Sequence, residues 1–290
     1  MNVLLTGATG FIGSHLSRRL EHAGHQVVPV SRAKLPGYLS WAEEDLMRGL
    51  DHADAVIHLA GEKVFDHRWN ARHKAAMRES RVTTTRRLAE LVAERERDAL
   101  LTASAVCYYG PSQQQELGEN SPPGDDFLSH LCRDWEEATA PAAEAGVRVA
   151  SVRIGPVWGK GGGVLAKMLP SFRLGLGGPV GSGEQWVSWI HMDDLCSLFL
   201  QLLENPELSG VFNGTAPRPV RMKELAETLG DVLGRPAKLA LPAPVLRATL
   251  GDEAAEVLLQ GQHVVPRRAE EIGFEFQYPT LRRALENLLC

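Results

Sequence analysis

Three glycines near the start of the chain, Gly7, Gly10 and Gly13, are spaced three residues apart in the stretch TGATGFIG. In a strand–turn–helix unit the first glycine permits a tight turn, the second lets a pyrophosphate approach the backbone, and the third lets the helix pack on the strand. Glycines in ordinary turns and helix caps could give the same spacing. The motif predicts a nucleotide site that also includes three residues of the turn: Thr9, Phe11 and Ile12.

The elements that must position this motif can be read on both sides of it. Residues 3–6 form an apolar run typical of a buried strand, and apolar residues recur on one helical face from Ile12 to Leu20. A second apolar run follows at 26–30. This strand–helix–strand opening places the glycines where free N–H groups at the start of a helix would face the phosphates.

The two residues after the second predicted strand, Ser31 and Arg32, bear on which dinucleotide fits. An acidic side chain at this point would hold a ribose 2′-hydroxyl, whereas a basic one holds a 2′-phosphate. No carboxylate occurs between Glu21 and Glu43, and arginine can bind a phosphate through paired, charge-assisted hydrogen bonds. The sequence therefore predicts NADP(H) as the cofactor, with a solvated loop arginine as the alternative interpretation of Arg32.

Strands and helices continue to alternate along the first half of the chain. Further buried strands are predicted at 55–60, 100–106 and 148–154, separated by helices at 70–96 and 127–145. Continuous apolar strands of this kind are typical of a parallel sheet that is covered on both faces. The predicted fold class is α/β, a Rossmann-type doubly wound parallel sheet with a smaller C-terminal α+β lobe.

The predicted boundary between the two parts follows residue 155. Residues 1–155 are assigned to the NADP-binding Rossmann domain, with 184–205 packing back on it. Residues 156–290 are assigned to the smaller lobe on the substrate side, because prolines break the chain into shorter elements from Val211 onward. A substrate would then lie between the two parts, at the carboxyl ends of the strands.

The composition excludes several kinds of partner. The 290 residues carry a net charge of −5, and the arginines are scattered, so nucleic acid is not expected to bind. No apolar run reaches the roughly 18 residues of a membrane helix, and no leader is recognised before the first strand. The four cysteines form no CxxC pair, which argues against a metal site or a disulfide framework. These features predict free thiols and a cytoplasmic location, or another reducing compartment.

Several separated stretches resemble one protein family. They include His58-Leu59-Ala60-Gly61, Tyr109-Gly110, Arg153-x-Gly155 and Ile190-His191-Met192-Asp193-Asp194, in addition to the glycine motif. On these residues the chain resembles an extended short-chain dehydrogenase/reductase of the NAD-dependent epimerase/dehydratase class. A finer resemblance, to the atypical branch called epimerase family protein, rests on Arg68-Trp69, Ser80-Arg81-Val82 and the glycine runs at 159–163 and 175–179.

The resemblance implies roles for residues that follow the later strands. Six of them would lie beside the cofactor: Leu59, Ala60, Gly61, Arg81, Ser104 and Val157. Ser104 matches the family's active-site serine or threonine if one residue is inserted before Tyr109-Gly110. Arg81 could instead be one more charge on an exposed helix.

The usual catalytic pair of the superfamily is missing from the helix that should carry it. In a Tyr-x-x-x-Lys pair the ammonium lowers the pKa of the phenol, which acts as general acid or base. Here Leu128 stands at the tyrosine position and Cys132 at the lysine position. Tyr108 and Tyr109 are the best substitute acids, with Ser104 polarising the substrate, and the weaker candidates are His130, His191 and Cys132. Tyr109 could instead pack under its loop with a satisfied hydroxyl.

Two classes of function remain open at this point. One is an NADP-dependent oxidoreductase or epimerase acting on a small polar substrate, which a glycine-rich cleft with Trp186, Trp189 and His191 could accept. The other is a non-catalytic NADPH-binding sensor or regulatory protein, which the missing Tyr-x-x-x-Lys pair favours. The exposed faces expected on helices 79–94 and 127–145 are rich in arginine and glutamate, so a monomer or a weak homodimer is predicted.

Overall fold

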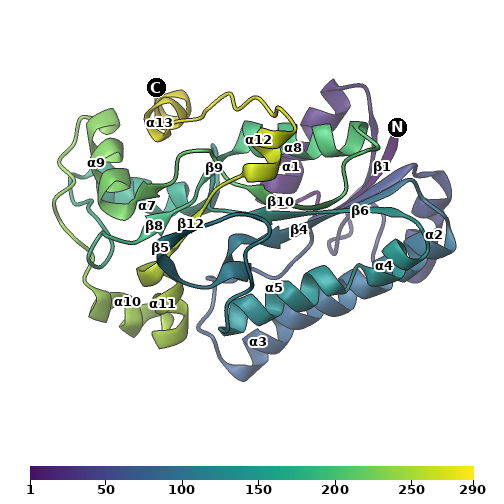
Figure 1. The fold of residues 1–290 in the computed structure, drawn as a ribbon, viewed down its shortest axis with the longest axis horizontal. Coiled ribbons are helices and arrows are strands. Elements are labelled where there is room, and N and C mark those ends of the chain that lie inside the picture. Colours follow the sequence, from purple (N-terminus) through teal and green to yellow (C-terminus); the bar gives the residue numbers. More distant parts are fainter.

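A six-stranded parallel sheet forms the centre of the computed structural model, which describes residues 1–290 (Figure 1). The strand order is β10-β6-β4-β3-β1-β2, and every neighbouring pair is parallel. In chain order these strands are β1 Asn2–Thr6, β2 Gln26–Val30, β3 Ala55–His58, β4 Ala99–Ala105, β6 Arg148–Ile154 and β10 Gly210–Gly214. The predicted Rossmann-type sheet is confirmed.

The chain changes direction across the sheet at β1. From β1 it passes to the neighbour β2 on one side, and it then returns to form β3 on the other side. Val3 accordingly pairs with both Val27 and Ala55. Connections leave the sheet in opposite directions at such a point, which opens a crevice at the carboxyl ends of the strands. The glycine turn, residues 7–13, lies at this crevice.

Helices cover both faces of the sheet, as Figure 1 shows. Leu5 and Ile57 contribute to the core on one face, whereas Leu4 and Val56 contribute to the core on the other. The covering helices are α1 Phe11–His22 and α8 Met192–Glu204 on the first face, and α2 Glu43–His52, α4 Thr84–Glu94 and α6 Ala140–Glu144 on the second. Because both faces are covered, all four residues of β3 are buried.

Both of the long predicted helices are interrupted. The helix predicted at 70–96 consists of α3 (Ala71–Arg78), a π-helical turn η1 (Glu79–Thr83) and α4. The helix predicted at 127–145 consists of two helices, α5 (Phe127–Glu137) and α6, with a short break between them. Pro141 lies in the first turn of α6, where no hydrogen bond from its nitrogen is needed. A proline in the interior of a continuous helix would remove one of the helix hydrogen bonds, so α5 does not continue through it.

The smaller lobe is built from short helices and two-stranded sheets around Trp158, Phe172 and Trp189, which are almost fully buried. Its helices are α7 Gly163–Arg173, α9 Met222–Leu233, α10 Ala243–Leu250, α11 Asp252–Gln260 and α13 Leu281–Leu289, whereas α12 Arg267–Glu271 packs on β10 of the main sheet. The sheets pair β5 Ser112–Leu117 with β12 Gln262–Val264, β7 Val157–Trp158 with β9 Ile190–His191, and β8 Trp186–Val187 with β11 Val220–Arg221. The β5–β12 pair joins the two parts of the chain.

The chain returns to the main sheet after residue 205. Helix α8, inside the segment 184–205, packs on the sheet. Residues 210–214 were assigned to the smaller lobe, but they form the edge strand β10, in register with β6. Phe212 is fully buried in this strand. The prolines that follow the strand made residues from 211 onward resemble the short elements of the smaller lobe, so the strand was not recognised as part of the main sheet. The predicted division at residue 155 is thus wrong for this strand.

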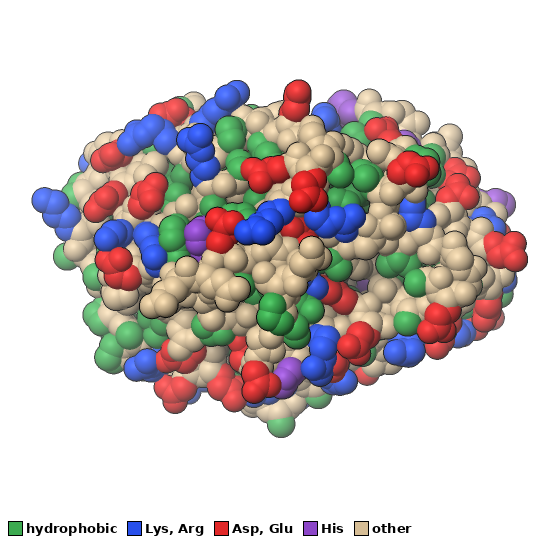
Figure 2. Space-filling model, in the orientation of Figure 1, with side chains coloured by type: hydrophobic (Ala, Val, Ile, Leu, Met, Phe, Trp, Pro, Cys, Tyr) green, Lys and Arg blue, Asp and Glu red, His purple; other side chains and the backbone are tan.

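Charges of both signs are mixed over the face drawn in Figure 2. No large area of a single sign interrupts this mixture on that face. None of the helices combines the length and the apolar character that a membrane crossing requires. All four cysteines are free, as the sequence predicted.

Candidate functional site

The three glycines of the turn are required for different structural reasons. Gly7 has a φ of +72°, and a Cβ there would lie 2.8 Å from the carbonyl carbon of Leu59. A Cβ on Gly13 would lie 2.1 Å from the Gly7 oxygen, so the third glycine is required for packing. A Cβ on Gly10 would meet only the Gly7 oxygen, at 3.1 Å, and would otherwise enter open space. The backbone at Gly10 is therefore accessible to a ligand, where α1 begins.

A second glycine run packs against the turn from the opposite side. A Cβ on Gly162 would lie 2.4 Å from Phe11 Cδ2, and one on Gly163 would lie 2.8 Å from the Val157 oxygen. Val157 itself is buried in the short β7–β9 sheet. The loop 159–163 thus needs glycine because it lies directly on the Phe11 ring. The sequence resemblance included this run but gave it no role.

Ser31 and Arg32 follow β2, next to the crevice. The Ser31 side chain is buried, and its hydroxyl accepts the Ala33 N–H at 3.0 Å. The Arg32 side chain is 78% exposed, and its Nη1 lies 3.5 Å from Glu62 Oε2. Arg32 is therefore free to turn toward a phosphate, but it would have to leave Glu62 to do so.

Leu59, Ala60 and Gly61 line the crevice after β3, and Arg81 reaches the same place from η1. The Gly7 turn packs on the Leu59–Ala60 peptide. A Cβ on Gly61 would lie 3.2 Å from Arg81 Cζ, so the guanidinium lies against this glycine. Arg81 Nη1 is buried without a hydrogen-bond partner. Arg81 is thus not the ordinary exposed helix charge that the alternative interpretation described.

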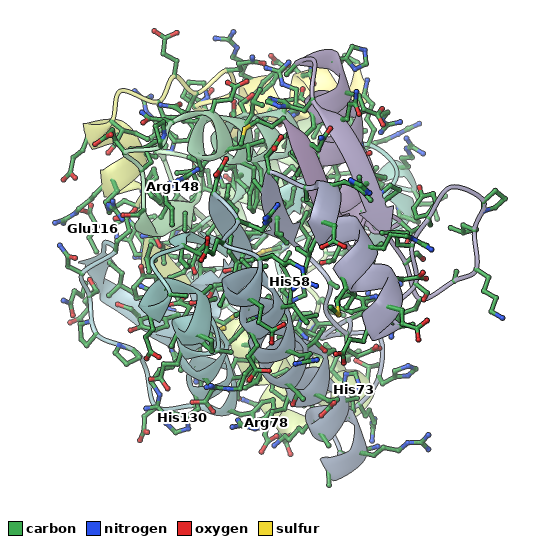
Figure 3. All side chains as sticks on the ribbon, turned by 90° about the vertical axis from the view of Figure 1, so that its right-hand side faces the viewer. His58, His73, Arg78, Glu116, His130 and Arg148 are labelled. Carbon is green, nitrogen blue, oxygen red and sulfur yellow. The ribbon has the colours of Figure 1, made fainter.

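His58, the last residue of β3, lies beneath the crevice (Figure 3). Its Nδ1 is 2.6 Å from Thr6 Oγ1, while its Nε2 has no partner. The Trp41 ring packs edge-on against the imidazole. Burial, assisted by the charge of Arg81, lowers the pKa of His58 to about 4. A neutral imidazole therefore supports the floor of the crevice at neutral pH.

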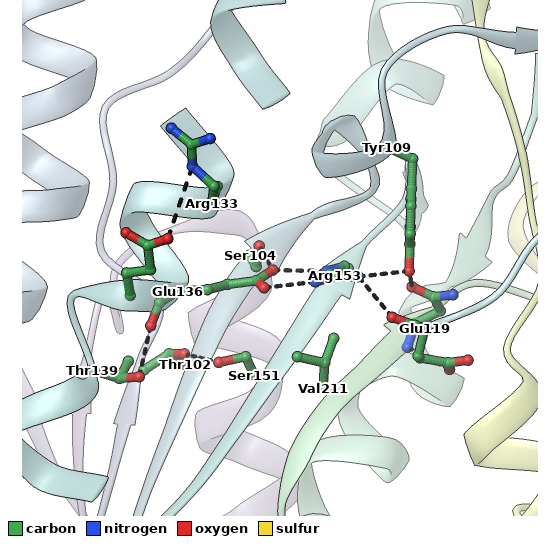
Figure 4. Close-up of polar contacts among 12 residues, drawn as sticks. Thr102, Ser104, Tyr109, Glu119, Arg133, Glu136, Thr139, Ser151, Arg153 and Val211 are labelled. Carbon is green, nitrogen blue, oxygen red and sulfur yellow. Dashed lines mark hydrogen bonds and ion pairs between the residues drawn. The ribbon is translucent and has the colours of Figure 1, made fainter. Parts of the chain in front are cut away.

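A buried ion pair joins the ends of β4 and β6 to α5 (Figure 4). Arg153 donates two hydrogen bonds to the Glu136 carboxylate, at 2.8 and 2.7 Å. Ser104 donates to the same carboxylate at 2.6 Å. Although burial opposes the charge, the hydrogen bonds and charge of Glu136 raise the pKa of Arg153 above its ordinary value. We call this pair and its hydrogen-bonded neighbours the Arg153 cluster: Ser104, Tyr109, Glu119, Glu136, Arg153 and Asn213.

The two tyrosines are held by the same arginine. The Tyr109 hydroxyl accepts from Arg153 at 2.9 Å and donates to Asn213 at 2.7 Å. Burial raises the pKa of Tyr109 to about 12, despite the nearby guanidinium. The Arg153 guanidinium also lies 3.3 Å from the centre of the Tyr108 ring. The structure thus shows Tyr109 with a satisfied hydroxyl whose proton is donated to Asn213, whereas Tyr108 contacts the arginine through its ring.

The weaker catalytic candidates lie in three different places. His130 is on the outer surface of α5, 3.0 Å from Asp125. His191 is buried, stacks on Tyr278 and accepts the Asp193 N–H, so it caps α8. Cys132 is buried, and burial raises the pKa of its thiol well above the ordinary value. These residues do not form one site.

The aromatic cleft predicted from Trp186, Trp189 and His191 is not present. Trp189 is fully buried in the core of the smaller lobe, and its indole N–H donates to the Arg218 carbonyl. Trp186 stacks on His263 with ring centres 4.0 Å apart. Glycine-rich loops suggested an open cleft here, but their glycines serve close backbone packing.

A cavity of about 330 Å³ opens instead between α5 and α11. Leu128 and Cys107 form part of its wall, and Trp69 and Phe127 supply aromatic surface. Leu128 is the residue at the position of the usual catalytic tyrosine, so the cavity lies where that tyrosine would act. No lysine, arginine or histidine lines it.

Two features of this region were missed in the sequence. Cys107, which in the sequence is only one of four cysteines outside any CxxC pair, lines the cavity. Glu136, one of several acidic residues of the helix predicted at 127–145, accepts hydrogen bonds from both Arg153 and Ser104. Buried strands with one charged residue near the end, as in β6, are a signal that could have pointed to this ion pair, because a buried arginine needs an acidic partner.

Comparison with known proteins assigns the chain to a family. Residues 3–213 match the NAD dependent epimerase/dehydratase family, and residues 241–288 match a domain of unknown function, DUF1731. The chain is 43% identical over its full length to the epimerase family protein SDR39U1 homolog, chloroplastic, of Arabidopsis thaliana, of which it covers 87%.

Solved structures agree with this assignment. The human epimerase family protein SDR39U1, crystallised with NADPH, superimposes with a TM-score of 0.93 at 40% identity, covering 99% of each chain. A nucleoside-diphosphate sugar epimerase of Corynebacterium glutamicum gives a TM-score of 0.80 at 36% identity, with 100% of this chain and 58% of that one covered. The chain therefore belongs to the NAD dependent epimerase/dehydratase family, in the group of epimerase family proteins.

Proposed function

We propose that the chain binds NADP(H) and uses it in an oxidoreductase or epimerase reaction on a small polar substrate. The observation that carries the proposal is the glycine turn, where Gly10 leaves the backbone open and α1 begins with free N–H groups. The human relative crystallised with NADPH supports the choice of cofactor.

Each part of the crevice has a role within this proposal. The backbone of residues 7–13 holds the pyrophosphate, Ser31 and Arg32 bind the 2′-phosphate, and Leu59 to Gly61 lie beside the rest of the cofactor. The loop 159–163 fixes Phe11 and so stabilises the turn. When bound, the cofactor supplies or accepts a hydride, while the protein positions it and excludes water.

The cavity beside Leu128 and Cys107 is the proposed place for the substrate. Asp126, Glu253 and Glu256 are among its lining residues, and it has no basic one. Glu253 and Glu256 form ion pairs with Lys74 and Arg247 at the edge of the cavity, and no basic side chain faces its interior to bind the phosphates of a nucleoside diphosphate. The substrate is therefore proposed to be small and not anionic.

The Arg153 cluster favours a second candidate function, that of a non-catalytic NADPH-binding sensor or regulatory protein. Ser104 and Tyr109 both donate their hydroxyl protons within the cluster. A residue whose proton is already committed is a poor general acid unless the cluster rearranges. As catalytic residues, Ser104, Tyr108 and Tyr109 stay predictions.

Titration of NADPH into the wild type and Gly10→Val by calorimetry tests cofactor binding. The branched side chain would fill the open space at Gly10 without meeting the core, so binding should fall at least about 100-fold while the melting temperature of the free protein changes little. Unchanged affinity would rule this site out.

Turnover separates the two candidate functions. Mass analysis of co-purified small molecules should guide a panel of neutral carbonyl compounds, with NADPH oxidation followed at a saturating cofactor concentration. Oxidation with any of them supports the enzyme, and tight NADPH binding without turnover across the panel favours the sensor. UDP-glucose serves as the anionic control and should not bind.

We also propose that the chain is a monomer or a weak homodimer. The outer side of the helical layer carries exposed ion pairs, among them Arg78 with Asp134 and Arg87 with Glu43. Such a charged surface is a poor core for a stable interface. A tight dimer in light scattering at nanomolar concentration would contradict this.

A further inference from the structure

Most of the large apolar side chains that the fold leaves exposed come from two segments of the smaller lobe. In the whole chain, eight such side chains are at least 39% exposed. Five of the eight belong to the turn after α7 or to the segment that leads into α10: Leu174, Leu176, Leu239, Leu241 and Val245. We call these five residues the Leu174 patch. Single exposed apolar residues are ordinary, whereas a group of them marks an interaction surface.

Backbone contacts hold the two segments side by side. The Leu239 N–H donates to the Gly177 carbonyl at 3.0 Å, and the Leu241 N–H donates to the Pro179 carbonyl at 2.8 Å. A Cβ on Gly178 would lie 2.3 Å from the Leu239 oxygen, so glycine is needed for this approach. Leu239 and Leu241 are two residues apart in an extended segment, and their side chains therefore point to the same side.

The turn after α7 meets the same segment. Gly175 lies between the two leucines of this turn, and a Cβ on it would lie 3.4 Å from Pro236 Cγ. Leu174 and Leu176 are nevertheless 74% and 57% exposed. An apolar side chain that lines a groove is partly covered by the walls of the groove. These two leucines therefore project from the surface.

The two segments carry positive charge only. No aspartate or glutamate occurs in residues 160–183 or 232–251. Glu256 of α11 reaches α10, but it forms an ion pair with Arg247 there. Three exposed cations within one to four residues of a patch leucine stand in no ion pair: Arg173, Arg235 and Lys238. Their field extends about 10 Å at 0.1 M salt, so they act on any charged surface that covers the leucines.

A second copy of the chain does not suit this surface. In a two-fold dimer the Leu174 patch would meet itself, so the same three cations would face one another with no carboxylate of these segments between them. A folded partner protein would need a separate pocket for each projecting leucine. The headgroup region of a lipid bilayer, by contrast, admits apolar side chains and, where acidic lipids are present, attracts cations.

We propose that the Leu174 patch docks the protein on an anionic membrane surface. The leucines enter the headgroup region, and the three unpaired cations face acidic lipid headgroups. Such peripheral binding depends on the apolar area that is buried and on the attraction to anionic lipids, and it requires no spanning helix. No residue of the glycine turn or of the cavity beside Leu128 belongs to the patch, so membrane docking and cofactor binding are separate properties of the fold.

Sedimentation with lipid vesicles tests the docking. The wild type should bind vesicles of phosphatidylcholine that contain about 30% phosphatidylglycerol at least about tenfold more tightly than vesicles of phosphatidylcholine alone. Leu174→Ser combined with Leu176→Ser should weaken binding to the anionic vesicles at least about tenfold, because the apolar area is lost, and should leave the melting temperature nearly unchanged. Leu35→Ser replaces an exposed leucine outside the patch and is the matched control, with no change expected.

The cations provide a second measurement. Replacing Arg173, Arg235 and Lys238 together with glutamine should weaken binding to the anionic vesicles about 100-fold, because each cation near such a surface contributes about fivefold. Arg86→Gln changes an exposed arginine of α4 and should have no effect.

Three results would overturn the inference. One is a wild type that does not bind the anionic vesicles, or binds both kinds of vesicle equally. Another is binding that is unchanged in the leucine variant or in the glutamine variant, since a different surface or charge alone would then be responsible. The third is a dimer in light scattering that Leu174→Ser dissociates, which would assign the patch to a second copy of the chain.

Discussion

The glycine turn and the Arg153 cluster both lie near the carboxyl edge of the sheet, but they are built in opposite ways. The turn is made of backbone, and residues within one short stretch determine its shape. The cluster is made of side chains that are far apart in the sequence: Ser104 meets Glu136 over 32 residues, and Tyr109 meets Arg153 and Asn213 over 44 and 104 residues. The first region leaves a surface open for a ligand, whereas the second uses up its polar groups internally.

This difference separates cofactor binding from catalysis in the molecule. A backbone cradle remains available whatever the surrounding side chains do, so a dinucleotide can be held by a chain that has no Tyr-x-x-x-Lys pair. Ser104 and Tyr109, two of the residues predicted to replace the pair, donate their hydroxyl protons to Glu136 and Asn213 within the Arg153 cluster. Substitutions in the Arg153 cluster should therefore change the stability of the fold, whereas substitutions in the cofactor crevice should change cofactor binding.

The largest effect is expected from Arg153→Met, which leaves the Glu136 carboxylate buried without its cation. The two side chains are only 4% and 14% exposed, so the loss should be about 3–5 kcal/mol in the free energy of unfolding, measured in urea. Under conditions where the variant remains folded, its NADPH affinity should match that of the wild type.

Two further variants sharpen this measurement. Arg153→Met combined with Glu136→Leu should recover much of the stability, because no buried charge remains. Arg133→Met removes an exposed arginine of α5, the helix that carries Glu136, and should change stability little. A loss below about 1 kcal/mol in Arg153→Met would mean that the cluster does not support the fold in the way described.

His58, under the cofactor crevice, should make stability depend on pH. Its folded pKa of about 4 lies below the ordinary value of 6.5, so the unfolded state binds a proton first as the pH falls. The stability present above about pH 6.5 is lost as the pH falls toward 4, by up to about 3 kcal/mol from this residue. His58→Asn keeps a polar atom near Thr6 but cannot titrate, and should lose less.

The difference between the two proteins is the quantity to measure, because Asp194 acts in the opposite direction. Burial raises the pKa of Asp194 to about 6, so this carboxyl favours the folded state as the pH falls. Urea unfolding of wild type and His58→Asn at intervals from pH 7 to 4 gives that difference. Parallel curves would show that His58 is not held neutral by the fold.

The sheet and the glycine turn could be predicted because their signals are local. Apolar runs such as 55–58 and the spacing of Gly7, Gly10 and Gly13 depend on neighbours in the sequence. The edge strand at 210–214 was missed, because its place beside β6 depends on tertiary pairing and prolines follow it closely.

The surroundings of the candidate catalytic residues and of the cavity beside Leu128 could not be predicted in the same way. Whether Tyr109 offers a free hydroxyl depends on Arg153 and Asn213, which come from other strands. The role of Cys107 depends on α11, which forms the opposite side of the cavity. Residue types and their spacing in the sequence identify candidate catalytic residues. Whether their protons are available depends on the partners that they meet in the folded structure.

Cofactor choice is expected to respond to Arg32 within the crevice. Arg32→Asp would replace the proposed partner of the 2′-phosphate with a repelling charge and offer NADH a ribose acceptor. The preference for NADPH over NADH should fall by about two orders of magnitude, with unchanged stability, since the side chain is 78% exposed. Paired titrations of both cofactors measure this, and a preference that survives the substitution would place the phosphate contact elsewhere.

The smallest effect is expected from Glu62→Gln, which tests how the negative charge of Glu62 affects Arg32 and Arg81, the two arginines of the crevice. Glu62 lies 3.5 Å from Arg32 and also acts on the pKa of Arg81, so it competes with any phosphate for the first and adds negative charge near the second. Removing this charge should tighten NADPH binding about two- to fivefold, because an exposed pair contributes less than about 1 kcal/mol.

Salt provides the internal control for this last variant. A screened interaction between partly exposed groups fades as the Debye length shortens from about 10 Å at 0.1 M to about 3 Å at 1 M, so the gain in NADPH affinity should disappear at high salt. NADH, which lacks the 2′-phosphate, should gain less than NADPH at low salt. If NADH gained as much, Glu62 would be acting through Arg81 and the shared half of the cofactor, and the competition for Arg32 would have to be abandoned.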